Sequence, residues 1–173
     1  MKKINLIITF FVLAAVTAVA QTQRFGFVDS EYISRNIPAF AAAQDQLDRL
    51  SEQWEKEVAD AYEVVEQMYR AYQNEAPLLS PEMRTRREEA IIEREREARA
   101  LQNRYFGMEG ELFRKREELV KPIQDEILRA IREIALEGNY TAIFDTASGG
   151  NILFTNPRFD ISDQVLERLG YRN

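Results

Sequence analysis

The sequence contains no cysteine and no histidine among its 173 residues. Without cysteine the chain has no disulfide, no thiolate metal site, no thiol nucleophile and no cysteine to carry a lipid. Without histidine it lacks the commonest general base and metal ligand, so its serines have no triad partner. The glycine pair in Ser148-Gly149-Gly150 has no lysine after it and reads as a turn rather than a phosphate loop. We therefore predict no catalytic residue, no cofactor and no metal site.

Basic charge is also scarce. The formal net charge is −6, and it becomes −8 once Lys2 and Lys3 are removed with the N-terminal segment, which contains no acidic residue. An acidic chain argues against nucleic acid, whose binding needs a basic surface. Asp29, Asp145 and Asp160 follow apolar runs. Capping and turn formation account for them, with a metal or acid/base role as the alternative.

The first twenty residues differ from the rest of the chain. Lys2 and Lys3 precede an apolar run over 4–19, and Ala18-Val19-Ala20 is a pattern that signal peptidase accepts. The alternative is a membrane anchor, but the run is shorter than the roughly 20 residues that span a bilayer, and no stop-transfer pattern follows. We expect residues 1–20 to be a signal peptide cleaved after Ala20, and the mature chain to be exported.

A long stretch, 39–137, shows no strand signal. Its firm interruption lies at 75–81, where Ser80 and the proline after it suit a helix start. On both sides apolar residues recur with the spacing of a coiled-coil seam. We predict two long antiparallel helices, 38–74 and 81–137, that form a hairpin arm with its tip near 75–81.

The second helix contains residues that disturb a helix. Gly107 and Gly110 weaken it, and Pro122 removes one hydrogen bond and must kink it. After Pro122 the apolar stripe becomes more aliphatic. We expect a tightly packed root beyond a bend and a looser outer arm.

Charge favours pairing of the two helices. Residues 41–75 contain nine acidic and three basic residues, whereas 84–104 contain seven arginines and five glutamates. Opposite charge on antiparallel helices fixes their register. At the tip, Leu78 and Leu79 have no local core to join. The predicted tip contacts are these leucines with Arg84, Arg86 and Arg87. The arginines form either a solvated face or a contact for acidic clients or an anionic lipid surface.

The apolar stripe of the arms is wider than a two-helix seam requires and is rich in aromatic residues. It is either the core of a larger bundle or a surface that holds another chain. The residues predicted for this binding face are Trp54, Val58, Tyr62, Val65, Tyr69, Tyr72, Leu101, Tyr105 and Phe106.

The remaining segments, 21–38 and 138–173, predict a small β-rich body. Strand signals lie at 24–30, 140–145 and 151–155, the last two forming a hairpin, and a short helix follows. A body this small is marginal alone, and its strands leave apolar edges that assembly between copies would cover. The residues predicted for the body of this assembly are Phe25, Phe27, Ile143, Phe144, Ile152 and Phe154.

The chain resembles the Skp (OmpH) family of periplasmic chaperones over essentially its whole mature length. The resemblance rests on motifs in a fixed order around the long hairpin. They are Phe25-Gly26-Phe27-Val28-Asp29-Ser30, Pro122-Ile123 with Ala130, Tyr140 to Asp145, Asn151 to Phe154, and Asp160-Ile161-Ser162 followed by Val165-Leu166.

The resemblance implies a mainly α, α+β fold: a periplasmic homotrimer with a small β-barrel body and three helical arms around a cavity. It also implies a holdase, independent of ATP, that shields unfolded outer-membrane proteins. The alternative is a coiled-coil scaffold of the cell envelope that binds one fixed partner. One departure concerns charge, since the best-known members are basic. Attraction of acidic clients would here have to be concentrated at Arg84, Arg86, Arg87, Arg94, Arg96 and Arg99.

Overall fold

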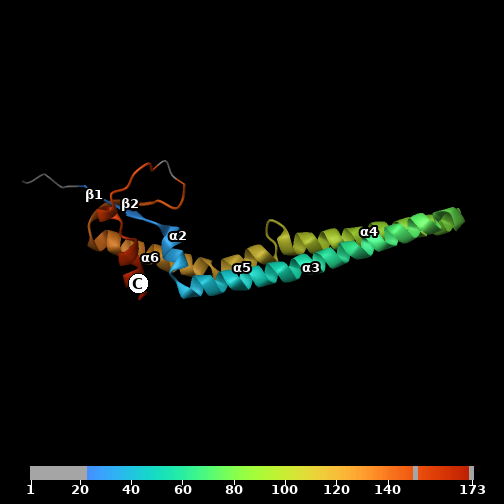
Figure 1. The fold of residues 1–173 in the computed structure, drawn as a ribbon, viewed down its shortest axis with the longest axis horizontal. Helices are drawn as coiled ribbons and strands as arrows, with labels where there is room; N and C mark the ends of the chain where they lie inside the picture. Colours follow the sequence, from blue (N-terminus) through green and yellow to red (C-terminus); the bar gives the residue numbers. More distant parts are fainter. Residues whose placement is uncertain (1–22, 150–151, 172–173) are drawn as a thin grey trace, which may run out of the picture.

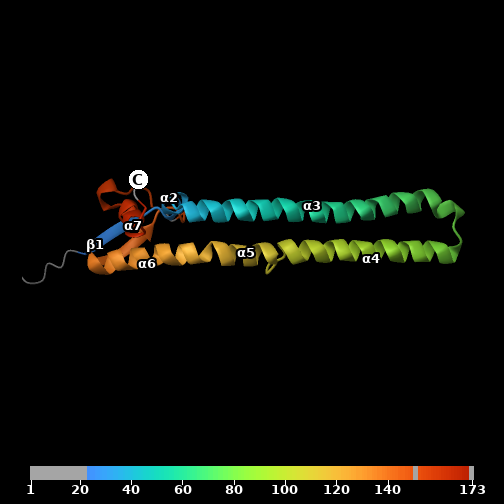
Figure 2. The ribbon, with the colours of Figure 1, turned by 90° about the horizontal axis from the view of Figure 1, so that it is seen from below.

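The computed structural model describes residues 23–149 and 152–171. The predicted signal peptide, 1–20, and Asn151 at the start of the predicted third strand lie outside these residues. The described chain is an elongated helical hairpin with a small body at one end (Figures 1 and 2). None of its helices combines the length and the hydropathy needed to cross a membrane.

The first arm is one helix, α3 (Pro38–Glu75), which begins with Pro38 in its first turn. After a single 3₁₀ turn, η1 (Ala76–Leu78), the chain reverses into α4 (Pro81–Phe106). Ser80 caps α4, because its hydroxyl accepts a hydrogen bond of 3.3 Å from the Met83 amide. The two arms then run back side by side (Figure 2). The predicted hairpin and its capped reversal are confirmed.

The second arm is not the single helix predicted over 81–137, and this prediction was wrong. It consists of α4, α5 (Glu111–Leu119) and α6 (Lys121–Glu137), and a loop projects from the hairpin between α4 and α5 (Figure 1). Glycine is needed in this loop, since a Cβ atom on Gly107 would lie 2.3 Å from the Asn103 carbonyl oxygen. The helix is interrupted again at Val120, and Pro122 occupies the first turn of α6, where its missing N–H costs nothing.

The body contains a two-stranded sheet in which β1 (Arg24–Val28) and β2 (Tyr140–Asp145) are parallel. The predicted antiparallel hairpin of 140–145 with 151–155 was wrong, because the described residues 152–155 form no strand. The chain instead returns to the other edge of β1. There the Ile161 amide donates a 2.9 Å hydrogen bond to the Phe27 carbonyl.

Two short helices and the arm roots close the body. α2 (Ser30–Arg35) is capped by Asp29, whose side chain accepts from the Tyr32 amide, and α7 (Ser162–Arg168) ends the fold. Asn139, with φ of 49°, makes the left-handed turn that releases the chain from α6 into β2. The side chains buried most completely in this core are Ile33, Ile161, Val165 and Leu166.

A second cluster extends the core into the root of the arms. Ala43 and Leu47 of α3 pack against Val120, and Leu112 and Ile123 lie beside them. Leu47 is only 2% exposed. The arm is therefore anchored by aliphatic packing next to the body, as the sequence predicted for its root.

Candidate binding surface of the helical hairpin

An apolar groove lies between the outer halves of α3 and α4, and we call it the tyrosine groove. From α3 it is lined by Tyr62, Val65, Glu66, Tyr69 and Tyr72. From α4 it is lined by Glu88, Ile91, Ile92 and Glu95. Its volume is about 570 Å³, within the range of binding sites for small apolar groups. Four of the nine residues predicted for the binding face thus gather in one place.

The tyrosines of this groove differ in what holds them. The Tyr72 hydroxyl donates to the Glu88 carboxylate, and the Tyr62 hydroxyl donates to Gln102 Oε1 at 3.0 Å. The hydrogen bond to Glu88 raises the pKa of Tyr72, so its phenol stays neutral. Tyr62 and Tyr72 therefore tie the arms together. Tyr69 is 51% exposed and offers its ring to a partner.

Closer to the body, side chains pack tightly between α3 and α4. The Trp54 and Tyr105 rings stack with their centroids 4.9 Å apart and their planes 7° from parallel. Val58 and Tyr105 are buried, at 9% and 8% exposed. These two predicted binding residues consequently hold α3 to α4 and present little surface to a partner. Phe106 lies beyond them, in a smaller hollow of about 320 Å³ that also reaches Tyr62.

Glu57 of α3 is a charged residue that interrupts the apolar coiled-coil spacing of the first arm, and the facing helix explains its place. The Tyr105 hydroxyl donates a hydrogen bond to its carboxylate across the hairpin. This bond lowers the pKa of Glu57 and raises the pKa of Tyr105, since it stabilises the carboxylate and the neutral phenol. Heptad spacing treats Glu57 as a defect, and only the position of the facing helix reveals its partner.

Sequence reasoning also missed several groove residues. Ile92, 49% exposed, was not predicted for the binding face, nor were the three glutamates at the rim. Leu101 was predicted but is half-buried and lines neither hollow. A charged residue flanking an apolar stripe was the available signal, but it does not distinguish a groove rim from an ordinary solvated face.

At the tip, Leu78 is 89% exposed and Leu79 is half-buried. Nearby glutamates offset much of the positive charge of the tip arginines. Arg86 pairs with Glu82 at 2.6 Å, and Arg87 pairs with Glu75 at 3.3 Å. The tip is therefore an apolar end with mixed charge, while Arg84 is exposed beside it.

The body carries a separate aromatic surface around the outer face of β1 and β2. The centroid of the Phe144 ring lies 6.2 Å from that of the Phe25 ring and 5.8 Å from that of the Phe27 ring. These rings and Phe159 line an apolar hollow of about 850 Å³, and Phe154 is 80% exposed. Ile143 points the other way and packs on the body core. The β-bulge after Arg24 sets this register. Ile152 is half-buried.

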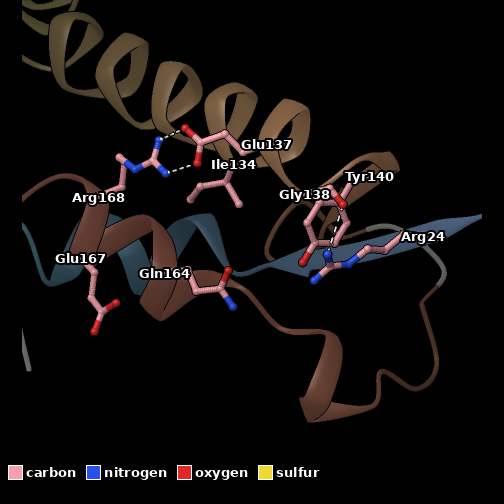
Figure 3. Close-up of a pocket in the computed structure, with 8 residues that line it drawn as sticks. All are labelled: Arg24, Ile134, Glu137, Gly138, Tyr140, Gln164, Glu167 and Arg168. Atoms are coloured by element: carbon pink, nitrogen blue, oxygen red, sulfur yellow. Dashed lines mark hydrogen bonds and ion pairs between the residues drawn. The ribbon is translucent and has the colours of Figure 1, made fainter.

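A polar hollow in the body has a structural explanation (Figure 3). The Arg168 guanidinium holds the Glu137 carboxylate through two nitrogens and also reaches Glu133 at 3.2 Å. Arg24 lies over the Tyr140 ring, 4.2 Å from its centroid, and donates to the Gly138 carbonyl. These groups satisfy one another and fasten α7 and β1 to α6.

Fold and surface together define a class of protein: a long helical hairpin with an aromatic groove, carried on a small α/β body. Residues 24–169 match the family described as Outer membrane protein (OmpH-like). The chain belongs to this family, and the resemblance found in the sequence is confirmed. A protein of Aquifex aeolicus (strain VF5) is 24% identical over 160 residues, covering 92% of this chain and 94% of that protein, and is named only as uncharacterized.

Proposed function

We propose that this protein is an ATP-independent periplasmic holdase, which binds unfolded outer-membrane proteins and keeps them from aggregating before insertion. Its signal peptide, residues 1–20, would direct export. Membership of the OmpH-like family supports a chaperone role rather than catalysis. The role needs weak, distributed contacts and no bound cofactor.

The observation that carries the proposal is the tyrosine groove. It lies far along the arm, away from the described part of the body (Figure 1), so it serves no packing need there. Exposed apolar surface of this kind marks interaction sites in soluble proteins. Because only part of each ring is open, each contact with a client is weak, which suits reversible capture.

We further propose that three copies assemble through the aromatic surface of the body. Phe25 and Phe144 are 40% and 45% exposed beside the sheet, which has two strands within the described residues, and the outer edge of β2 invites pairing with another chain. Closure into a shared barrel would bury both the rings and that edge. Three arms would then enclose one cavity. Mass measurement by light scattering should give a trimer, and Phe144→Ser should give smaller species, while a wild-type monomer would contradict the assembly.

The function is tested by diluting several urea-unfolded β-barrel membrane proteins, and one unrelated protein, into buffer with the purified mature chain. A holdase keeps turbidity low for all the barrel proteins, without ATP. Binding to a single partner, or to none, would favour the scaffold alternative. The closed stack of Trp54 on Tyr105 is the observation that fits a scaffold, but the open groove beyond it does not.

We also propose that the arm tips contact an anionic lipid surface. Leu78 and Met83 are exposed there, but Arg86 and Arg87 already face glutamates. Flotation with anionic vesicles measures it directly. Equal flotation with neutral vesicles would leave only the apolar contribution of the tip.

A further inference from the structure

We propose that the tyrosine groove selects client segments in which apolar side chains alternate with lysine or arginine. This inference rests on the proposed function and names the class of segment that the groove accepts. It reverses the expectation that arginines of the arm attract acidic clients.

The polar part of the groove wall is acidic. Its charged lining residues are Glu66, Glu88 and Glu95, and neither arginine nor lysine lines it. The surrounding stretches 58–73 and 88–95 contain seven acidic residues and two arginines. The local field is therefore negative, and a cationic segment approaches it favourably.

The carboxylates are available to a new partner. Glu66 pairs with Arg70 and Glu95 pairs with Arg99, each at 2.5 Å and one turn apart on an exposed helix face. Exposed pairs of this type are weak, so a client cation can replace the arginine. The Glu88 carboxylate accepts a hydrogen bond from the Tyr72 hydroxyl, and its oxygens have lone pairs left for a second donor.

The tyrosine rings complete the recognition. A cation held by Glu66 or Glu95 lies over a groove floor that includes the half-exposed Tyr69, and tyrosine faces attract cations. Val65, Ile91 and Ile92 supply apolar contacts between the charged positions. An extended segment alternates its side chains between two faces, so apolar and basic residues in alternation match floor and rim.

The test uses the full mature protein and three labelled peptides that alternate leucine and tryptophan with lysine, glutamine or glutamate. Fluorescence anisotropy should show the lysine peptide binding about five- to tenfold more tightly than the glutamate peptide. The preference should shrink as ionic strength rises from about 0.1 M to about 1 M, because the Debye length falls from about 10 Å to about 3 Å.

A matched pair of double variants locates the effect. Glu66→Gln with Glu95→Gln removes two rim charges and should abolish the preference for lysine. Glu82→Gln with Glu93→Gln removes the same charge and also breaks two arginine pairs, but neither residue lines the groove, so the preference should remain. Circular dichroism checks that both variants keep their helices.

Each outcome decides something. Equal binding of all three peptides, or a preference that survives in the groove variant, overturns the charge selection. If aggregation of barrel proteins is still suppressed in that case, the holdase function stands and the selection alone fails. If no peptide binds and no aggregation is suppressed, the proposed function fails and this inference fails with it.

Discussion

Tyr69 is the residue at which binding and stability separate most cleanly. The sequence treats Tyr62, Tyr69 and Tyr72 as one set, but Tyr62 and Tyr72 also bond across the hairpin. Tyr69→Ser therefore removes binding surface without removing a tether. We expect weaker client binding at unchanged helix content.

The size of the effect follows from the exposed ring. A tyrosine side chain buries about 200 Å² when covered, and Tyr69 is 51% exposed, so about 100 Å² is open to a client. At about 25 cal/mol per Å² this gives at most about 2.5 kcal/mol. A mobile client covers the ring incompletely, so we expect a loss of about 1–2 kcal/mol, or about 5- to 30-fold in Kd.

The assay is titration of a labelled, urea-unfolded barrel protein with wild-type or variant chain. Phe113→Ser is the control, because Phe113 is 50% exposed, as open as Tyr69, but does not line the groove. A Kd unchanged in Tyr69→Ser, or weakened equally in both variants, would refute the assignment of this groove. Unfolding midpoints for both should stay close to wild type, since neither side chain is buried.

Three further predictions concern stability. Leu47→Ala should lower the free energy of unfolding by about 2–4 kcal/mol, measured by urea unfolding, because it leaves a cavity in the root of the arms. Burial raises the pKa of Asp145, but hydrogen bonds from the Ser30 hydroxyl and amide and the Ala147 amide outweigh it, so the net pKa is lowered. The stabilisation by the Asp145 carboxylate is complete above the unfolded-state pKa of 3.8 and is lost as the pH falls through the lower folded-state pKa. Asp145→Asn should therefore reduce the free energy of unfolding at neutral pH and remove this acid dependence, measured by urea unfolding from neutral pH to below pH 3.8. An unchanged slope of unfolding free energy against pH would contradict this role. Gly107→Ala should lower the free energy of unfolding by about 1–3 kcal/mol and speed amide hydrogen exchange around the loop, since the added Cβ would clash with the Asn103 carbonyl oxygen. An exchange rate in the variant equal to that of the wild type would show that the loop accommodates the Cβ without strain.

Local features of the arms were predictable. Ser80, Pro81 and the spacing of apolar residues specify where the arms begin and reverse, because capping and helical periodicity act within a few residues. Pro122 likewise predicted a disturbance of the second arm. The complete break at Gly107 was underestimated, since glycine lowers helix propensity only slightly and gives no measure of a backbone clash.

The sequence by itself determined the hairpin, its tip and its family, because these depend on patterns of residues that lie close together along the chain. Tertiary structure alone decided which stripe residues close the seam and which stay open. Val58 and Tyr105 are buried between α3 and α4, whereas Tyr69 is half-exposed, because of the way the two helices meet across the hairpin. It also decided that β2 pairs with β1, since strand pairing joins residues more than a hundred positions apart.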